Sequence, residues 1–182
     1  MGILDKLFQK QTDPSGQLDN ESPGNLMLMG IIASSIIIFD DKWTDYKRRR
    51  GETFELIILS TLLILRKFRE IRPMQYNKFE EDLFMQIQKF ARQEQIIQML
   101  PMDFADFINS RFVLYDDEFS VDDHHQVKTP VHTVYNLFER PLAKDSGVCE
   151  DLFKVIEVQI KFKAYYEQLL TSFNFMISKK YS

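Results

Sequence analysis

The chain has little cysteine and little glycine. Cys149 is the only cysteine among 182 residues, so no internal disulfide bond can form. A disulfide-stabilised scaffold is excluded, and the composition fits a reducing compartment, which predicts a cytoplasmic protein. With six glycines, the sequence has no Gly-rich loop to cradle phosphate groups and no Gly-x-Ser-x-Gly motif of a serine hydrolase.

Long hydrophobic runs are also missing. The two apolar stretches that must be weighed, residues 26–39 and 56–65, fall short of the roughly 20 apolar residues that a membrane-spanning helix needs. We therefore expect no transmembrane segment and interpret both stretches as buried helices. The N-terminus lacks the pattern of a signal peptide, and Lys6 replaces the Ser or Thr of a myristoylation motif.

Strand patterns and internal repeats are absent, whereas helical periodicity recurs along the chain. Apolar stripes and capping residues predict four longer helices, at residues 22–50, 52–71, 77–100 and 148–176, and two short helices, at 103–115 and 130–138. The sequence therefore predicts an all-α protein, a helical bundle of four longer helices plus two short ones. We expect one domain over residues 22–182, preceded by a flexible tail at 1–21 that is rich in polar residues, Pro and Gly.

The expected helix ends rest on capping residues. Gly51 is predicted to lie just past the end of the first helix, where a left-handed residue commonly follows. Asn77 and Glu80 resemble a capping box at the start of the third helix, which Pro101 is expected to end. Asp103 is expected to cap the helix that follows.

The last helix has the most regular pattern in the sequence. Nine residues follow one another in alternating steps of four and three, as in a helix that packs at a shallow angle in a bundle. Gln159 is the only polar member of this seam: Val148, Leu152, Val155, Gln159, Phe162, Tyr166, Leu169, Phe173 and Met176.

Two helices are apolar on more than one face. The middle of the helix at 52–71 and the first half of the helix at 22–50 are both apolar all round, which predicts that each is covered on every side. A small bundle encloses one such helix easily and two with difficulty. We therefore expect an excess apolar face that meets a second copy, another protein or an apolar ligand.

Histidines and carboxylates gather in one loop. This candidate metal site consists of Asp122, Asp123, His124, His125 and His132. Imidazole and carboxylate groups suit Zn²⁺ or another transition metal. The spacing matches neither a His-Glu-x-x-His motif nor the Glu-x-x-His pairs of di-iron bundles, which favours a solvated acidic loop.

Charge is unevenly distributed. Residues 42–72 carry nine bases and four acids, whereas residues 99–126 carry seven acids and one base. Bases beside Trp43 and Tyr46 could bind single-stranded nucleic acid. The aromatic residues continue an apolar stripe, however, and the basic clusters lie at opposite ends of one helix. We therefore expect no nucleic-acid partner.

A short apolar cluster precedes the polar tail: Ile3, Leu4, Leu7 and Phe8. Its helical spacing would let it act as a docking tag on its own domain, on a protein partner or on a membrane surface. A frayed end without function is the more common fate of such a segment.

These observations favour a non-enzymatic helical protein that binds another protein in an interaction or regulatory role and forms a homodimer. The helix at 22–50 is the expected contact surface, and the acidic loop at 116–129 is a second candidate. Two alternatives stay open. One is a metal-binding or hydrolytic helical-bundle enzyme that uses the Asp/His loop at 122–132, and the other is a carrier of an apolar ligand. We expect no cofactor.

Overall fold

The computed structural model describes residues 20–39, 50–118, 142 and 152–181. These residues form an all-α bundle without strands, as the sequence predicts. The α-helices are α2 (Pro23–Phe39), α3 (Arg50–Ile71), α4 (Tyr76–Gln93), α5 (Phe104–Glu118) and α7 (Leu152–Lys180). Two short 3-10 helices, η3 (Pro73–Gln75) and η4 (Ile97–Met99), flank α4. Within the described segments, none of the helices combines the length and apolarity needed to cross a bilayer. The expected short helix at 130–138 lies outside the described residues.

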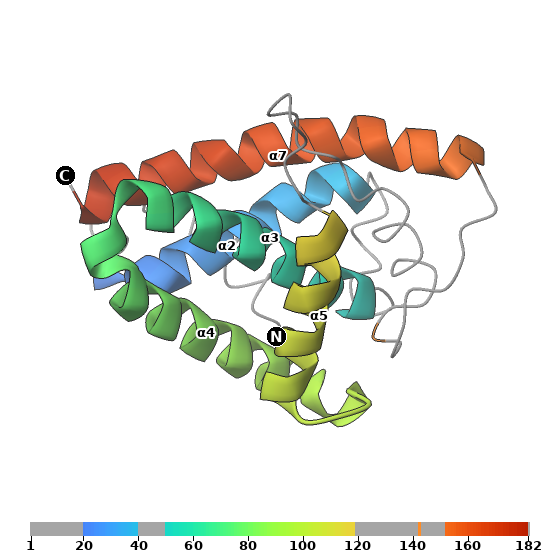
Figure 1. Ribbon diagram of the computed structural model, residues 1–182, viewed down its shortest axis with the longest axis horizontal. Coiled ribbons are helices and arrows are strands. Elements are labelled where there is room, and N and C mark those ends of the chain that lie inside the picture. The colour runs from blue at the N-terminus through green and yellow to red at the C-terminus, as the bar shows by residue number, and fades with distance from the viewer. Residues whose placement is uncertain (1–19, 40–49, 119–141, 143–151, 182) are drawn as a thin grey trace.

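Helix α2 is the centre of the bundle. It packs against α7 along its length, crosses α4 and also touches α3 (Figure 1). Two glycines permit close approach at these crossings. A Cβ at Gly24 would lie 2.6 Å from the backbone nitrogen of Leu83 on α4, and a Cβ at Gly30 would lie 2.7 Å from Cβ of Ser172 on α7. Glycine is therefore needed where the helices come closest.

The start of α2 is capped from another helix. Asp82 on α4 accepts hydrogen bonds from the backbone N–H of Gly24, at 2.6 Å, and from the hydroxyl of Ser22, at 2.9 Å. Oγ of Ser22 also accepts from the backbone N–H of Asn25 at 3.2 Å, as expected of an N-cap serine. The carboxylate is favourably placed because the N-terminus of a helix carries partial positive charge.

Helix α3 is enclosed on nearly all sides, in agreement with the sequence. Every residue from Thr53 to Leu62 is buried. The expected boundary before it is wrong, because Gly51 does not follow the end of a preceding helix but lies, buried, in the first turn of α3. The Arg50 guanidinium donates a 2.8 Å hydrogen bond to the carbonyl of Glu94 beyond α4. This tertiary contact favours α3 starting at Arg50, against the local signal of a glycine cap.

Both predicted ends of the helix at 77–100 need correction. Its N-cap is Gln75, and Glu80 accepts a 2.7 Å hydrogen bond from the Tyr76 hydroxyl instead of completing a capping box with Asn77. The helix ends at Gln93, because Gln95 adopts a left-handed conformation with φ of 60°. The Ile96 amide then bonds the Ala91 carbonyl at 2.8 Å, which closes a Schellman motif.

The other helices follow the sequence more closely. Asp103 caps α5 as predicted, since its side chain accepts a 3.0 Å hydrogen bond from the amide of Ala105. Helix α5 continues to Glu118, so the first three residues of the expected acidic loop are helical. In α7, Phe162, Leu169, Phe173 and Met176 of the predicted seam are buried and Tyr166 is half-buried.

Candidate functional site

The predicted metal ligands and the predicted docking tag both lie outside the described residues. The same holds for Cys149, Trp43 and Tyr46. Within the segments that the structure describes, no group of three or more His, Cys, Asp or Glu residues is arranged to hold a metal ion. The candidate ligands Asp122, Asp123, His124, His125 and His132 therefore stay a sequence-based hypothesis.

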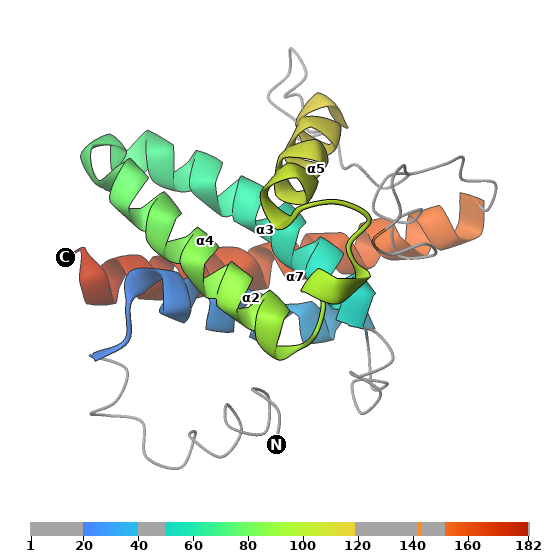
Figure 2. The ribbon, with the colours of Figure 1, turned by 90° about the horizontal axis from the view of Figure 1, so that it is seen from below.

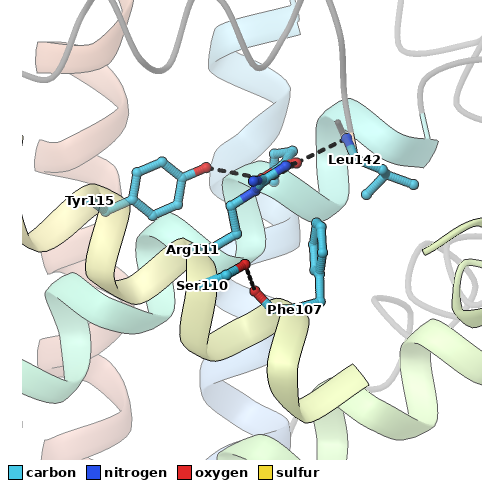
Figure 3. Close-up of polar contacts among 6 residues, drawn as sticks. Phe107, Ser110, Arg111, Tyr115 and Leu142 are labelled. Carbon is cyan, nitrogen blue, oxygen red and sulfur yellow. Dashed lines mark hydrogen bonds and ion pairs between the residues drawn. The ribbon is translucent and has the colours of Figure 1, made fainter. Parts of the chain in front are cut away.

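The most elaborate polar arrangement among the described residues is a buried ion pair between Glu55 on α3 and Arg111 on α5 (Figure 3). The Arg111 guanidinium donates from Nη2 to Oε1 of Glu55 at 2.8 Å and from Nε to Oε2 at 3.0 Å. The Tyr115 hydroxyl donates to Oε2 at 3.0 Å, and the backbone N–H of Leu142 donates to Oε1 at 2.9 Å. We call these four residues the Glu55 cluster.

Helix periodicity and an apolar surround place the Glu55 cluster in the core. Phe107, Arg111 and Tyr115 lie at successive steps of four on α5, so they face α3 together. The Phe107 ring lies under the Arg111 guanidinium, with 4.5 Å between its centroid and Cζ. Such a cation–π contact is strengthened by the absence of water.

The Glu55 carboxylate is already saturated by internal donors. Both oxygens accept hydrogen bonds, and both charged side chains are only about 1% exposed. A buried ion pair of this kind must recover a desolvation cost of several kcal/mol per ion, which good geometry and additional hydrogen bonds make possible. The arrangement therefore holds α3, α5 and the backbone at Leu142 in fixed relation.

Leu142 is held in an unusual backbone conformation. Its φ is 64°, in the left-handed region that side chains other than Gly, Asn and Asp seldom occupy. Its side chain is buried with the core cluster while its N–H bonds Glu55. These two contacts stabilise a conformation that would otherwise cost of order 1–3 kcal/mol.

Sequence reasoning missed the Glu55 cluster. Glu55 was assigned only a favourable place near a helix N-terminus, and Arg111 appeared only as the single base of an acidic segment. A signal was present, because Glu55 is an acid next to the all-round apolar run at 56–65. Arg111 likewise lies on the apolar face of α5, where an unpaired charge would be costly.

A second buried polar contact joins α3 to α7. Ser60 donates to the carbonyl of Leu56 at 2.5 Å, so its oxygen accepts from the Tyr165 hydroxyl, which approaches it closely. Burial raises the pKa of Tyr165 well above its usual value, and the hydrogen bond with Ser60 opposes that rise only in part. The group is a neutral structural anchor at ordinary pH.

The bases of α3 are divided between its two ends. Arg66 pairs with Asp116 on α5, and Lys67 pairs with Glu70 at 3.2 Å. Farther along, Arg69 lies over the ring of Tyr76 and Arg72 donates to a backbone carbonyl. Arg50, by contrast, lies at the opposite end of the same helix. This division agrees with the sequence-based argument against a continuous nucleic-acid surface.

The expected contact surface on the first helix needs correction. Within its described part, Leu26, Met27, Leu28, Ile31 and Ile32 are buried. Helix α2 is covered by α3, α4 and α7 of its own chain. The bundle therefore encloses both apolar helices, which the composition made unexpected.

Apolar surface remains elsewhere, on η4 and α5. Met99 is 53% exposed and Val113 is 66% exposed. Half-buried apolar side chains accompany them in the same segment: Ile97, Leu100, Met102, Phe104, Phe112 and Leu114. We call these eight residues the α5 apolar surface. Phe112 also packs on Phe84 of α4, with 5.8 Å between ring centroids.

Comparison of the chain with protein-family models, with curated proteins and with solved structures finds no significant match, so the argument about function rests on the residues described above.

Proposed function

We propose that this chain is a non-enzymatic helical protein that acts by binding another protein molecule, and that it forms a homodimer. The observation that supports this proposal is the α5 apolar surface. A large exposed apolar patch on a soluble bundle commonly marks a protein interface.

The position of α5 explains why this surface suits a partner. One face of the helix, with Phe107, Ile108, Arg111 and Tyr115, is buried in the chain. Val113 lies on the opposite face, because two residues further along a helix correspond to a rotation of about 200°. An apolar residue on that face gains roughly 25 cal/mol per Å² when a partner removes it from water.

Self-association is the simplest way to cover such a face. In a two-fold dimer the same patch serves both subunits, so one apolar helix surface is sufficient for a complementary pair. The Glu55 cluster supports this use, because it fixes α5 on α3 and so presents the surface in a defined position.

Native mass spectrometry of the full chain, together with light scattering across a range of concentrations, tests the proposal. We expect a dimer without added mass for the wild type and a monomer for Val113→Glu. Ile160→Glu is the matched control, because Ile160 is 69% exposed on α7 and away from α5. It should leave the dimer intact.

Two results would contradict the proposal. A wild-type monomer at every concentration would remove the homodimer. Excess mass that disappears with a chelator or after organic extraction would instead indicate a metal or an apolar ligand.

A further inference from the structure

The turn between α3 and α4 ends in an exposed apolar tip. Met74 is 92% exposed and Ile71 is 43% exposed, and Pro73 and Gln75 beside them are also exposed. Figure 1 shows this turn at the end of the bundle where α7 also ends, and Figure 2 shows the same neighbourhood from below. We call residues 71–75 the α3–α4 tip.

Bases surround the α3–α4 tip. Arg69 and Lys78 are exposed on either side of it, and Arg72 lies within it. Lys179 and Lys180 end α7 beside the turn, since Arg72 Nη2 donates to the carbonyl of Tyr181 at 2.8 Å.

The partners of these bases are mostly uncharged. Arg69 lies over the Tyr76 ring, with 5.2 Å between Cζ and the centroid, and Arg72 bonds a neutral carbonyl. The acids that follow in α4 are directed elsewhere: Glu80 accepts from Tyr76, and Asp82 caps α2. Glu70 is paired with Lys67, which leaves Glu81 as an exposed carboxylate one turn past the tip. The tip therefore keeps a local excess of positive charge in a chain whose net charge is −4.

The tip is also held in place. Backbone hydrogen bonds join the amide of Arg72 to the carbonyl of Phe68 at 2.8 Å and the amide of Gln75 to the carbonyl of Arg72 at 3.1 Å. Behind it, the Phe68 ring packs on Phe79 at 4.2 Å and on Tyr181 at 5.2 Å between centroids. Met74 is therefore presented on a firm base, which reduces the entropy lost on binding.

We propose that the α3–α4 tip is a docking site for an anionic membrane surface. An exposed apolar side chain can enter the boundary between headgroups and acyl chains, while flanking Lys and Arg stay at the level of the anionic headgroups. Charge complementarity and an apolar point at the same place favour a lipid surface over a nucleic acid, which would reward the bases and leave Met74 without a partner. This contact is peripheral and needs no spanning helix.

Co-sedimentation of the full chain with vesicles tests the proposal. We expect binding to vesicles of phosphatidylcholine mixed with phosphatidylserine, no binding to phosphatidylcholine alone, and weakening as salt is added. Replacing Arg69 and Lys78 together by Gln should weaken binding about thirtyfold, at roughly fivefold for each base near the surface. Met74→Ser should weaken it about fivefold.

Matched variants separate the tip from general effects. Lys89→Gln combined with Lys163→Gln changes the net charge equally at exposed positions outside the tip, and Met85→Ser removes an equally large exposed side chain from α4. Both should bind anionic vesicles as the wild type does.

Several results would overturn the proposal. These are no binding to the anionic vesicles, equal binding to neutral ones, equal losses in the tip variants and their controls, or binding that survives the tip substitutions. Binding of a single-stranded oligonucleotide through Arg69 and Lys78, without binding to vesicles, would assign the bases to nucleic acid and likewise reject the lipid surface.

Discussion

Arg111 on α5 and Glu55 on α3 form a bidentate ion pair inside the bundle, 56 residues apart in the chain. Each side chain is about 1% exposed, so neither charge can be solvated by water. The pair also receives the Tyr115 hydroxyl and the Leu142 amide, which makes it the junction of three separate segments. Its energetic role can be tested directly.

Removing one charge of this pair should be strongly destabilising. We expect Arg111→Met to lower the free energy of unfolding by about 3–5 kcal/mol, because Glu55 is left buried without its counter-ion. Adding Glu55→Gln should recover part of that loss, since no uncompensated charge then remains. Urea unfolding of the two single variants and the double variant measures the coupling. Strictly additive losses would show that the two side chains do not stabilise each other.

Close packing at Gly30 makes a second prediction. Alanine is the better helix former by about 1 kcal/mol, yet Gly30→Ala should destabilise the protein because its Cβ would approach Cβ of Ser172 at 2.7 Å. Adding Ser172→Gly should restore part of the stability by removing the obstructing atom. Thermal unfolding of the three variants tests this. A neutral or stabilising Gly30→Ala would show that α2 and α7 are less closely packed.

Gly24 should behave differently from Gly30. Its added Cβ would meet backbone atoms of α4, 2.6 Å from the nitrogen of Leu83 and 2.7 Å from the carbonyl carbon of Asp82. No single side-chain truncation can relieve that contact. We therefore expect Gly24→Ala to cost about 1–3 kcal/mol, as measured by urea unfolding. A rescue by substitution of a neighbouring side chain would contradict the backbone contact.

The cap of α2 by Asp82 is a longer-range test. Asp82→Ala should cost about 1–2 kcal/mol, in the range of lost N-caps, and should speed exchange of the Gly24 amide proton. Glu81→Ala is the control, because Glu81 is the exposed neighbour on the same helix. Hydrogen exchange followed residue by residue distinguishes a local loss of the cap from global destabilisation. Unchanged protection at Gly24 would remove Asp82 as its partner.

Tyr165 predicts an alkaline limit to stability. An unfolded tyrosine ionises near pH 10, whereas burial raises the folded pKa of Tyr165 above that value. The stabilisation linked to this shift is fully present below about pH 10 and is lost as pH rises through the folded pKa. Tyr165→Phe should lower stability at neutral pH, through the lost bond to Ser60, and reduce the decline of stability above pH 10.

A second tyrosine acts in the same direction. Burial and the adjacent Glu80 carboxylate raise the pKa of Tyr76 to about 12. The decline should therefore be reduced and not abolished in Tyr165→Phe. Unfolding free energies measured in urea from neutral to alkaline pH give the slope. Equal slopes for the variant and the wild type would show that the Tyr165 hydroxyl ionises in the folded state as it does in the unfolded chain.

Local patterns determined much of the secondary structure. Alternating steps of four and three identified Phe162, Leu169, Phe173 and Met176 as core residues of α7, and they are buried. Asp103 was recognisable as an N-cap because capping depends on the side chain and the next few amides. Helix ends without such a signal were missed. Gln95 ends α4 in a left-handed conformation that sequence rules reserve mainly for Gly and Asn.

The candidate site depended on partners that are remote in sequence. Glu55 and Arg111 each carry a local pattern, but neither pattern identifies the other residue, and Leu142 lies a further 31 positions past Arg111. Asp82 caps α2 across 58 residues for the same reason. The sequence by itself determined which segments are helical and which faces are apolar, because periodicity is a property of neighbours. Only the tertiary structure decided which helices meet, since burial requires each polar group to find its partner wherever packing brings one within reach.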